Sequence, residues 1–181
     1  MTLFAFTSMT TFSVITQVVP FFVESGLTPL EAATAFGTAG MLSVLGIPAA
    51  GWAGDRLGPR ATVTTTFVFT LLGILALLAL AQEPAKWLVL AWIACFGTMQ
   101  GARGPIVSSL AARHFHGPGF ATIYGTMFAW MSLAGAFGGL VAGLLYDLTG
   151  GYTAGLLFST VTVFIAASPF WTRDPLGAAR K

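Results

Sequence analysis

Residues 61–82 read ATVTTTFVFTLLGILALLALAQ and carry no charge between Arg60 and Glu83. A helix needs about 20 mostly apolar residues to cross the hydrocarbon core of a bilayer. The apolar residues from Leu71 to Leu78 are continuous rather than alternating with polar ones, as a strand with one buried face would require. Lipid offers the backbone no hydrogen-bond partners, so a spanning segment satisfies its own N–H and C=O groups as a helix. This stretch therefore predicts a transmembrane helix.

Runs of similar length lie on both sides of it, and only Arg103 interrupts one of them. The predicted spans are 2–23, 32–54, 61–82, 87–112, 117–146 and 148–172. The alternative is a soluble core built of buried strands, but such strands run for about 4–8 residues. We therefore expect an all-α membrane protein with six transmembrane helices.

The composition of the whole chain agrees with this class. Of 181 residues, 56% are hydrophobic and 8% are charged, and the mean hydropathy is +0.84. A soluble domain carries about 25% charged residues. These values exclude a soluble enzyme, a nucleic-acid binder and a disordered tail, so the expected surroundings are a lipid bilayer and nucleic acid is not an expected partner.

The few charges also predict sidedness. If both chain ends lie on one side, that side holds Arg56, Arg60, Arg113, Arg173, Arg180 and Lys181. The other side holds one basic residue, Lys86, and four acidic residues, Glu24, Glu31, Glu83 and Asp147. Cytoplasmic loops carry an excess of Lys and Arg. We expect both termini in the cytoplasm, with the protein in a plasma membrane or bacterial inner membrane.

An internal repeat is visible at an offset of 92 residues. Five positions of the second predicted span and its exit recur identically in the fifth: Gly46/Gly138, Ala50/Ala142, Gly51/Gly143, Asp55/Asp147 and Gly58/Gly150. Copies three spans apart face opposite sides of the membrane, which is typical of inverted repeats in transporters. The sequence predicts one domain over 1–181, built from three-helix repeats at 1–84 and 85–176. Chance similarity between Gly- and Ala-rich helices is the alternative.

The segment from Gly51 to Arg60, GWAGDRLGPR, resembles the G-x-x-x-D-R-x-G-R-R signature of the major facilitator superfamily. Pro59 departs from the basic residue usual at that position. The segment from Gly143 to Tyr152 is similar to the end of the eleventh span in many members. The resemblance implies the C-terminal six-helix half, spans seven to twelve, of a transporter that moves small solutes by alternating access. It also implies that Gly51, Asp55, Arg56, Gly58 and Arg60 form a conformational latch; the alternative is a plain loop with topogenic charges.

Members of this family have twelve spans in two halves, and this chain accounts for six. Three explanations are open: a fragment of a longer protein, a half-transporter paired with a separate chain, or a homodimer. We favour the fragment, because an isolated half leaves its cavity face exposed to lipid. The expected partner is a missing N-terminal half or a second copy of the chain.

Arg103 is the charge that falls within a predicted span, about 24 Å along the fourth helix from Trp87. An intramembrane Arg is costly and usually functional, and this chain has no acidic residue in mid-span to pair with it. We expect it to bind substrate, for which a small organic anion is the first candidate; the alternative is that it reaches toward the interface. Gln17 and Gln100 are further substrate-binding candidates, and Tyr124 is a weaker one.

Gly135, Gly139 and Gly143 recur every four residues in the fifth span, which predicts close helix packing. The third and sixth spans lack such a seam, so we expect them at the lipid-facing periphery.

His114 and His116 are too few ligands for a metal site, and the single cysteine, Cys95, excludes a disulfide. We find no nucleophile–base pair and expect neither metal nor cofactor, so an intramembrane enzyme is disfavoured. The hypothesis from sequence is secondary active transport of a small solute. The alternative is a non-transporting polytopic subunit for interaction or assembly.

Overall fold

A computed structural model describes residues 2–102 and 119–172, and the side chains of these except 2–4, 59–60 and 169–172. The regular elements are all helical in these ranges. They are α1 (Thr2–Glu24), α2 (Pro29–Leu57), α3 (Pro59–Leu80), α4 (Lys86–Trp92), the π-helical turn η1 (Ile93–Gly97), α5 (Thr98–Gln100), α7 (Phe120–Thr149) and α8 (Thr153–Thr172).

Four of the helices are long and apolar enough to cross a membrane: α1, α2, α3 and α7. Residues Thr153–Ser168 of α8 form a shorter apolar helix. The fourth predicted span is described from Lys86 to Gln100, as α4, η1 and α5 in succession, and its remainder lies outside the described residues. The prediction of an all-helical membrane protein is confirmed, with four clear spans rather than six among the residues described.

Local chemistry explains where the long helices begin and end. Thr28 accepts a hydrogen bond from the backbone N–H of Glu31, and the Glu31 carboxylate accepts one from the N–H of Thr28, so a capping box starts α2. Gly58 is the single residue between α2 and α3, and its φ of +86° is a conformation that favours glycine. Gly150 ends α7 with φ +67°, and its N–H donates to the carbonyl of Tyr146 at 2.8 Å.

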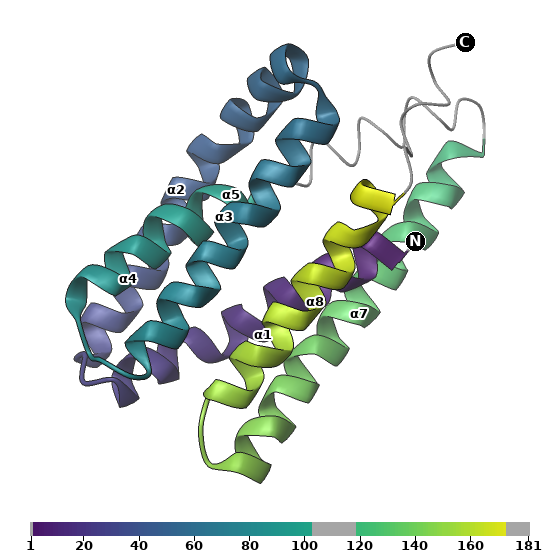
Figure 1. Ribbon diagram of the computed structural model, residues 1–181. Coiled ribbons are helices and arrows are strands. Elements are labelled where there is room, and N and C mark those ends of the chain that lie inside the picture. Colours follow the sequence, from purple (N-terminus) through teal and green to yellow (C-terminus); the bar gives the residue numbers. More distant parts are fainter. Residues whose placement is uncertain (1, 103–118, 173–181) are drawn as a thin grey trace.

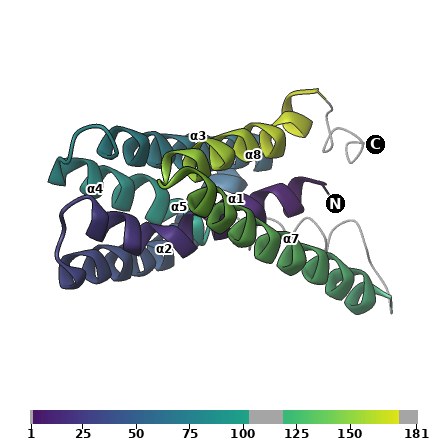
Figure 2. The same ribbon diagram turned by 90° about the horizontal axis from the view of Figure 1, so that it is seen from below.

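The helices lie in three layers (Figures 1 and 2). Helices α3 and α8 occupy one side of the bundle, α2 and α7 the opposite side, and α1 with α4–α5 the middle. Helix α1 packs against α7 and α8, while the α4–η1–α5 segment packs against α2 and α3. The start of α1, the α2–α3 connection and the end of α8 lie at one end of the bundle (Figure 1).

Glycines allow the middle layer to approach the outer helices. A Cβ added at Gly138 of α7 would lie 2.7 Å from the Cα of Met9 in α1. A Cβ added at Gly46 of α2 would collide with the backbone carbonyl of Thr98 in α5. In both places the obstacle is backbone, so the helices could not stay this close with a larger residue.

Hydroxyl pairs join α1 to α8 inside the bundle. The Oγ1 atoms of Thr10 and Thr162 are 2.8 Å apart, and the Oγ atoms of Ser13 and Ser159 are 2.9 Å apart. All four residues are buried. Hydrogen bonds between side chains hold membrane helices together because lipid cannot compete for the hydroxyl groups.

Helices α3 and α8 contact each other on the side of the bundle away from α2 and α7. Each buries one face and exposes large apolar side chains on the other, among them Val68, Leu72 and Leu75 on α3 and Leu157 and Val161 on α8. Exposed side chains of this kind are suited to contact with lipid.

Candidate functional site

The latch segment predicted from the sequence lies at the end of α2. Asp55 and Arg56 are exposed there, and the guanidinium carbon of Arg56 lies 4.9 Å from the centre of the Trp52 ring, which is a cation–π contact. Asp55 makes no ion pair with any residue that the structure describes. Arg60 is the second residue of α3, and its side chain lies outside the described part. The segment therefore presents both a carboxylate and a guanidinium away from the bundle.

The glycines of this segment have two different roles. Gly58 makes the tight α2–α3 turn with its positive φ. A Cβ added at Gly51 or Gly54 would meet no atom within 4 Å. The close helix approach that these two glycines permit is therefore not made by any residue that the structure describes, and this surface is open to a further neighbour.

Gln17 belongs to α1 and lies where this helix meets α8. Its Oε1 atom would be 2.8 Å from a Cβ added at Gly155, so the glycine makes room for the amide. Ser13 and Tyr152 line the same small cavity, whose volume of about 10 Å³ corresponds to roughly one water molecule. Gln17 thus lies in a helix contact, with a polar neighbour on each side.

The polar contacts around Tyr152 continue to the end of the bundle. The rings of Tyr146 and Tyr152 are 4.5 Å apart, and the Tyr146 hydroxyl donates to the Glu24 carboxylate at 3.4 Å. Burial raises the pKa of the Tyr152 hydroxyl, and the nearby Tyr146 and Glu24 act in the same direction. Tyr152 therefore stays neutral at physiological pH and can both donate and accept a hydrogen bond.

The other substrate-binding candidates are dispersed. Gln100 ends α5 and is half-buried. Tyr124 stacks on Phe120 in α7, with ring centres 5.7 Å apart. Arg103 lies outside the described residues. No described contact joins Gln17, Gln100 and Tyr124, so the part of the chain that is described does not assemble them into one pocket.

The predicted glycine ridge of α7 is only partly used. Gly135 faces Phe12 and Ser8 of α1, and a Cβ at Gly139 would be 3.4 Å from Thr16. A Cβ at Gly143 would meet nothing within 4 Å. The packing therefore involves the first two glycines, together with Gly138, and leaves the third on an open face.

Sequence reasoning missed an open glycine-rich surface on the layer formed by α2 and α7. It is formed by positions where an added Cβ would meet nothing within 4 Å: Gly37, Gly40 and Gly51 on α2, and Gly125 and Gly143 on α7. Only small residues are buried on these two helices, namely Ala32, Ala35, Ala39, Gly46 and Ala50 on α2 and Gly135, Gly138 and Ala142 on α7. The signal in the sequence is that glycines occur on two faces of each helix, and only one of these faces packs against other described residues.

Comparison with known proteins identifies the family. The protein-family model described as Major Facilitator Superfamily matches residues 1–181. The chain is 29% identical over 148 residues to "Probable nitrate/nitrite transporter NarK2" of Mycobacterium tuberculosis (strain ATCC 25618 / H37Rv), covering 79% of this chain and 36% of that protein. It is 34% identical over 136 residues to "Monocarboxylate transporter 13" of Rattus norvegicus and 33% identical over the same length to that of Bos taurus, in each case covering 72% of this chain and 30% of the relative.

The chain thus spans about a third of the length of these curated relatives. Its apolar helices and its similarity to transporters agree with membrane transport of small solutes. Because the family model matches the full length given, this chain belongs to the major facilitator superfamily.

Proposed function

We propose that this chain is one six-helix half of a secondary transporter that carries a small anion across the membrane by alternating access. The observation that carries the proposal is the family match together with the names of the relatives, since nitrate, nitrite and monocarboxylates are all small anions. Arg103 fits such a substrate, because an intramembrane guanidinium needs a negative partner and an anion supplies one.

The proposed architecture is an inverted repeat of three helices plus three, corresponding to spans seven to twelve. Equivalent positions 92 residues apart have similar surroundings, which supports the repeat. Gly46 and Gly138 both lie against backbone, Ala50 and Ala142 are both buried, and Gly58 and Gly150 both end a helix with positive φ. The motif from Gly51 to Arg60 supports the placement in the C-terminal half only by resemblance.

We place the other half of the transporter on the open faces of α2 and α7. Glycines on a helix surface allow another backbone to approach closely. Several glycines on α2 and α7 have no neighbour among residues 2–102 and 119–172. A separate chain, a segment of the same polypeptide or a second copy could each supply that neighbour, and the substrate cavity would lie between it and this half.

The latch is the second part of the mechanism. Asp55 is exposed at the end of α2, where the positive end of a partner helix or a basic side chain could reach its carboxylate. Contact in one conformation and separation in the other would bias the equilibrium between open states. The excess of Lys and Arg supports placing this end, with both termini, in the cytoplasm.

Uptake into proteoliposomes tests the proposal. The chain is reconstituted with its upstream or partner half, and uptake of labelled nitrate and of a short monocarboxylate is measured for the wild type, Arg103→Gln, Arg103→Lys and the control Arg180→Gln. We expect Arg103→Gln to raise KM about tenfold or more, as loss of a charge-assisted hydrogen bond would, and Arg103→Lys to retain part of the affinity. Absence of uptake with both halves present would refute the transporter proposal and favour an interaction subunit, while an unchanged KM would dismiss only the role of Arg103.

A further inference from the structure

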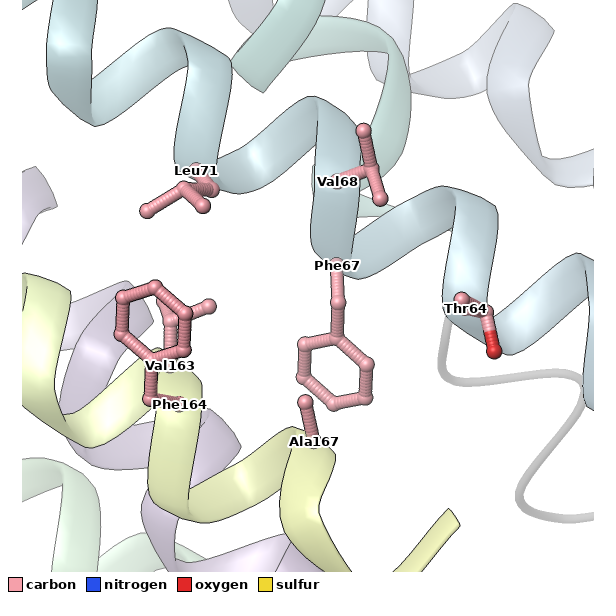
Figure 3. A pocket seen from close by; sticks show the side chains of 7 residues that line it. All are labelled: Thr64, Phe67, Val68, Leu71, Val163, Phe164 and Ala167. Atoms are coloured by element: carbon pink, nitrogen blue, oxygen red, sulfur yellow. The ribbon is translucent and has the colours of Figure 1, made fainter. Parts of the chain in front are cut away.

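A groove lies between α3 and α8, on the side of the bundle opposite the open glycine faces of α2 and α7 (Figures 2 and 3). Its volume is about 50 Å³, and it is open on one side. The lining is apolar: Phe67, Val68 and Leu71 from α3, and Val163, Phe164 and Ala167 from α8. Thr64 lies at one end of it (Figure 3).

The position of the groove along the helices places it within one leaflet. Thr64 is five residues after Pro59, the first residue of α3, and Ala167 is five residues before Thr172, the last residue of α8. At about 1.5 Å per residue, the groove begins about 8 Å inside the end of the bundle that holds the α2–α3 turn. This depth corresponds to the outer part of the hydrocarbon region rather than to the bilayer centre.

The chemistry of the groove selects an apolar and flexible occupant. A polar solute would find no charged group among the residues that line the groove. The flanking side chains are large and apolar, with Val68 48% and Phe164 50% exposed. Close docking of another helix favours the glycine-rich surface on the opposite side of the bundle. An acyl chain is narrow and flexible and can lie along such a groove.

A basic residue precedes the groove in α3, toward the end of the bundle where a lipid headgroup would be. Arg60 is one helical turn before Thr64 in α3, toward the end of the bundle. Arg56, four residues before Arg60 in the sequence, is exposed at the end of α2. Positive side chains near the membrane surface attract anionic lipids. Along α3, the basic residue and the apolar groove therefore follow each other in the order in which a phospholipid presents its phosphate and its chain.

We propose that the α3–α8 groove binds an acyl chain of an anionic phospholipid whose phosphate is held at Arg60. This site is separate from any substrate cavity facing the other half, and it does not depend on the substrate proposed above. Because Arg60 also belongs to the latch segment, an occupied site would connect the lipid surroundings to that segment.

The test measures lipid retained by the full chain after delipidation in detergent. Phosphatidylglycerol or phosphatidylcholine with the same acyl chains is added back, and bound lipid is counted by native mass spectrometry. The wild type is expected to retain phosphatidylglycerol about fivefold more than phosphatidylcholine, as one basic contact would produce. Equal retention of the two lipids would overturn the anionic headgroup.

Two matched substitutions on α3 test the groove itself. Val68→Trp fills the groove, whereas Leu72→Trp adds a Trp at a similarly exposed position, 46% against 48%, that does not line it. We expect Val68→Trp to retain both lipids about tenfold less, as loss of burial for about two methylene groups would produce. Leu72→Trp is expected to resemble the wild type. Equal retention by the two variants would overturn the groove as the site.

Two further variants separate the contribution of the acyl chain from that of the lipid headgroup. Phe164→Ala removes one wall of the groove from the exposed side of α8 and is expected to weaken retention of both lipids. Arg60→Gln is expected to abolish the preference for phosphatidylglycerol while leaving retention of phosphatidylcholine unchanged. A preference that survives Arg60→Gln would refute its role. If Val68→Trp changed the oligomeric state but not the retention of lipid, the occupant would be a second protein chain and the proposal would be wrong.

Discussion

Gly138 and Gly143 lie five residues apart in α7, but replacing each by alanine should have different effects on the free energy of unfolding. A Cβ at Gly138 would lie 2.7 Å from the Cα of Met9 and 2.9 Å from its carbonyl carbon. Both atoms belong to the backbone of α1, so no side-chain rotation relieves the overlap. A Cβ at Gly143 would meet nothing within 4 Å. The two positions therefore share a helix and a substitution but differ in the space around them.

The expected magnitudes follow from these surroundings. Replacing a glycine in the middle of a helix by alanine stabilises the helix by about 0.5–1 kcal/mol when space is available. Gly143→Ala should therefore be neutral or stabilising by up to that amount. Forcing a methyl group into a packed contact costs about 1–3 kcal/mol, because the helices must separate. After the gain in helix propensity, Gly138→Ala should still be destabilising, and the two variants should differ by about 1–3 kcal/mol.

The assay is thermal unfolding of the purified chain in one detergent, and the measured signal is the loss of helix packing. For a chain of this size, about 1 kcal/mol shifts Tm by roughly 2–4 °C. The repeat supplies an independent pair, since Gly46 faces the backbone of Thr98 and Gly51 is open. Gly46→Ala should therefore lower Tm relative to Gly51→Ala. Variants at Gly138 and Gly143 with the same Tm would refute the close α1–α7 contact, and the same result at Gly46 and Gly51 would refute the contact between α2 and α5.

Three further predictions concern the hydroxyl pairs, the tight turn and the sidedness. A double-mutant cycle with Thr10→Val and Thr162→Val should give a coupling of about 0.6 kcal/mol in equilibrium unfolding, and zero coupling would contradict the buried pair. Gly58→Ala should destabilise the chain by about 1–3 kcal/mol because its φ and ψ of +86° and 152° suit glycine alone, while Gly54→Ala serves as the unstrained control in the same measurement. In a Cys95→Ala background, Glu83→Cys should react with a membrane-impermeant maleimide in intact cells and Leu57→Cys only after permeabilisation; the reverse pattern would invert the proposed topology.

The sequence was sufficient to predict the helical spans because lipid imposes a length and a composition on them. The run at 61–82 corresponds closely to α3, and the run at 2–23 corresponds to α1. The prediction ended α2 at Gly54, yet the helix continues to Leu57. Charged residues can occupy the last turn of a spanning helix, so hydropathy alone places the boundary too early. The uneven fourth span was not predicted, because the π-helical turn at Ile93–Gly97 has no distinctive composition.

The substrate-binding candidates were harder to predict, since they were chosen by residue type. Gln17 was selected as an uncharged polar side chain within a span. Its surroundings depend on where α1 crosses α8, and the two helices are separated by most of the chain. Only that crossing brings the notch at Gly155 beside Gln17 and pairs the hydroxyl of Ser13 in α1 with that of Ser159 in α8. A single sequence contains no direct record of such a crossing, and the role of Gln17 in substrate binding remains a prediction.

The uneven burial of the helices supports the half-transporter proposal independently of the motif. About 39% of the most apolar part of α1 and 44% of that of α3 are buried, against 22% in α2 and 17% in α7. The two least buried of these four helices are those that contain the repeated glycine pattern, and each leaves some of its glycines without a neighbour in the described part of the chain. A duplicated unit would be expected to leave the same face open in both copies. If one partner covered both faces, the glycines that pack inside this half and those that remain open would have the same physical purpose, which is to bring helix backbones close together.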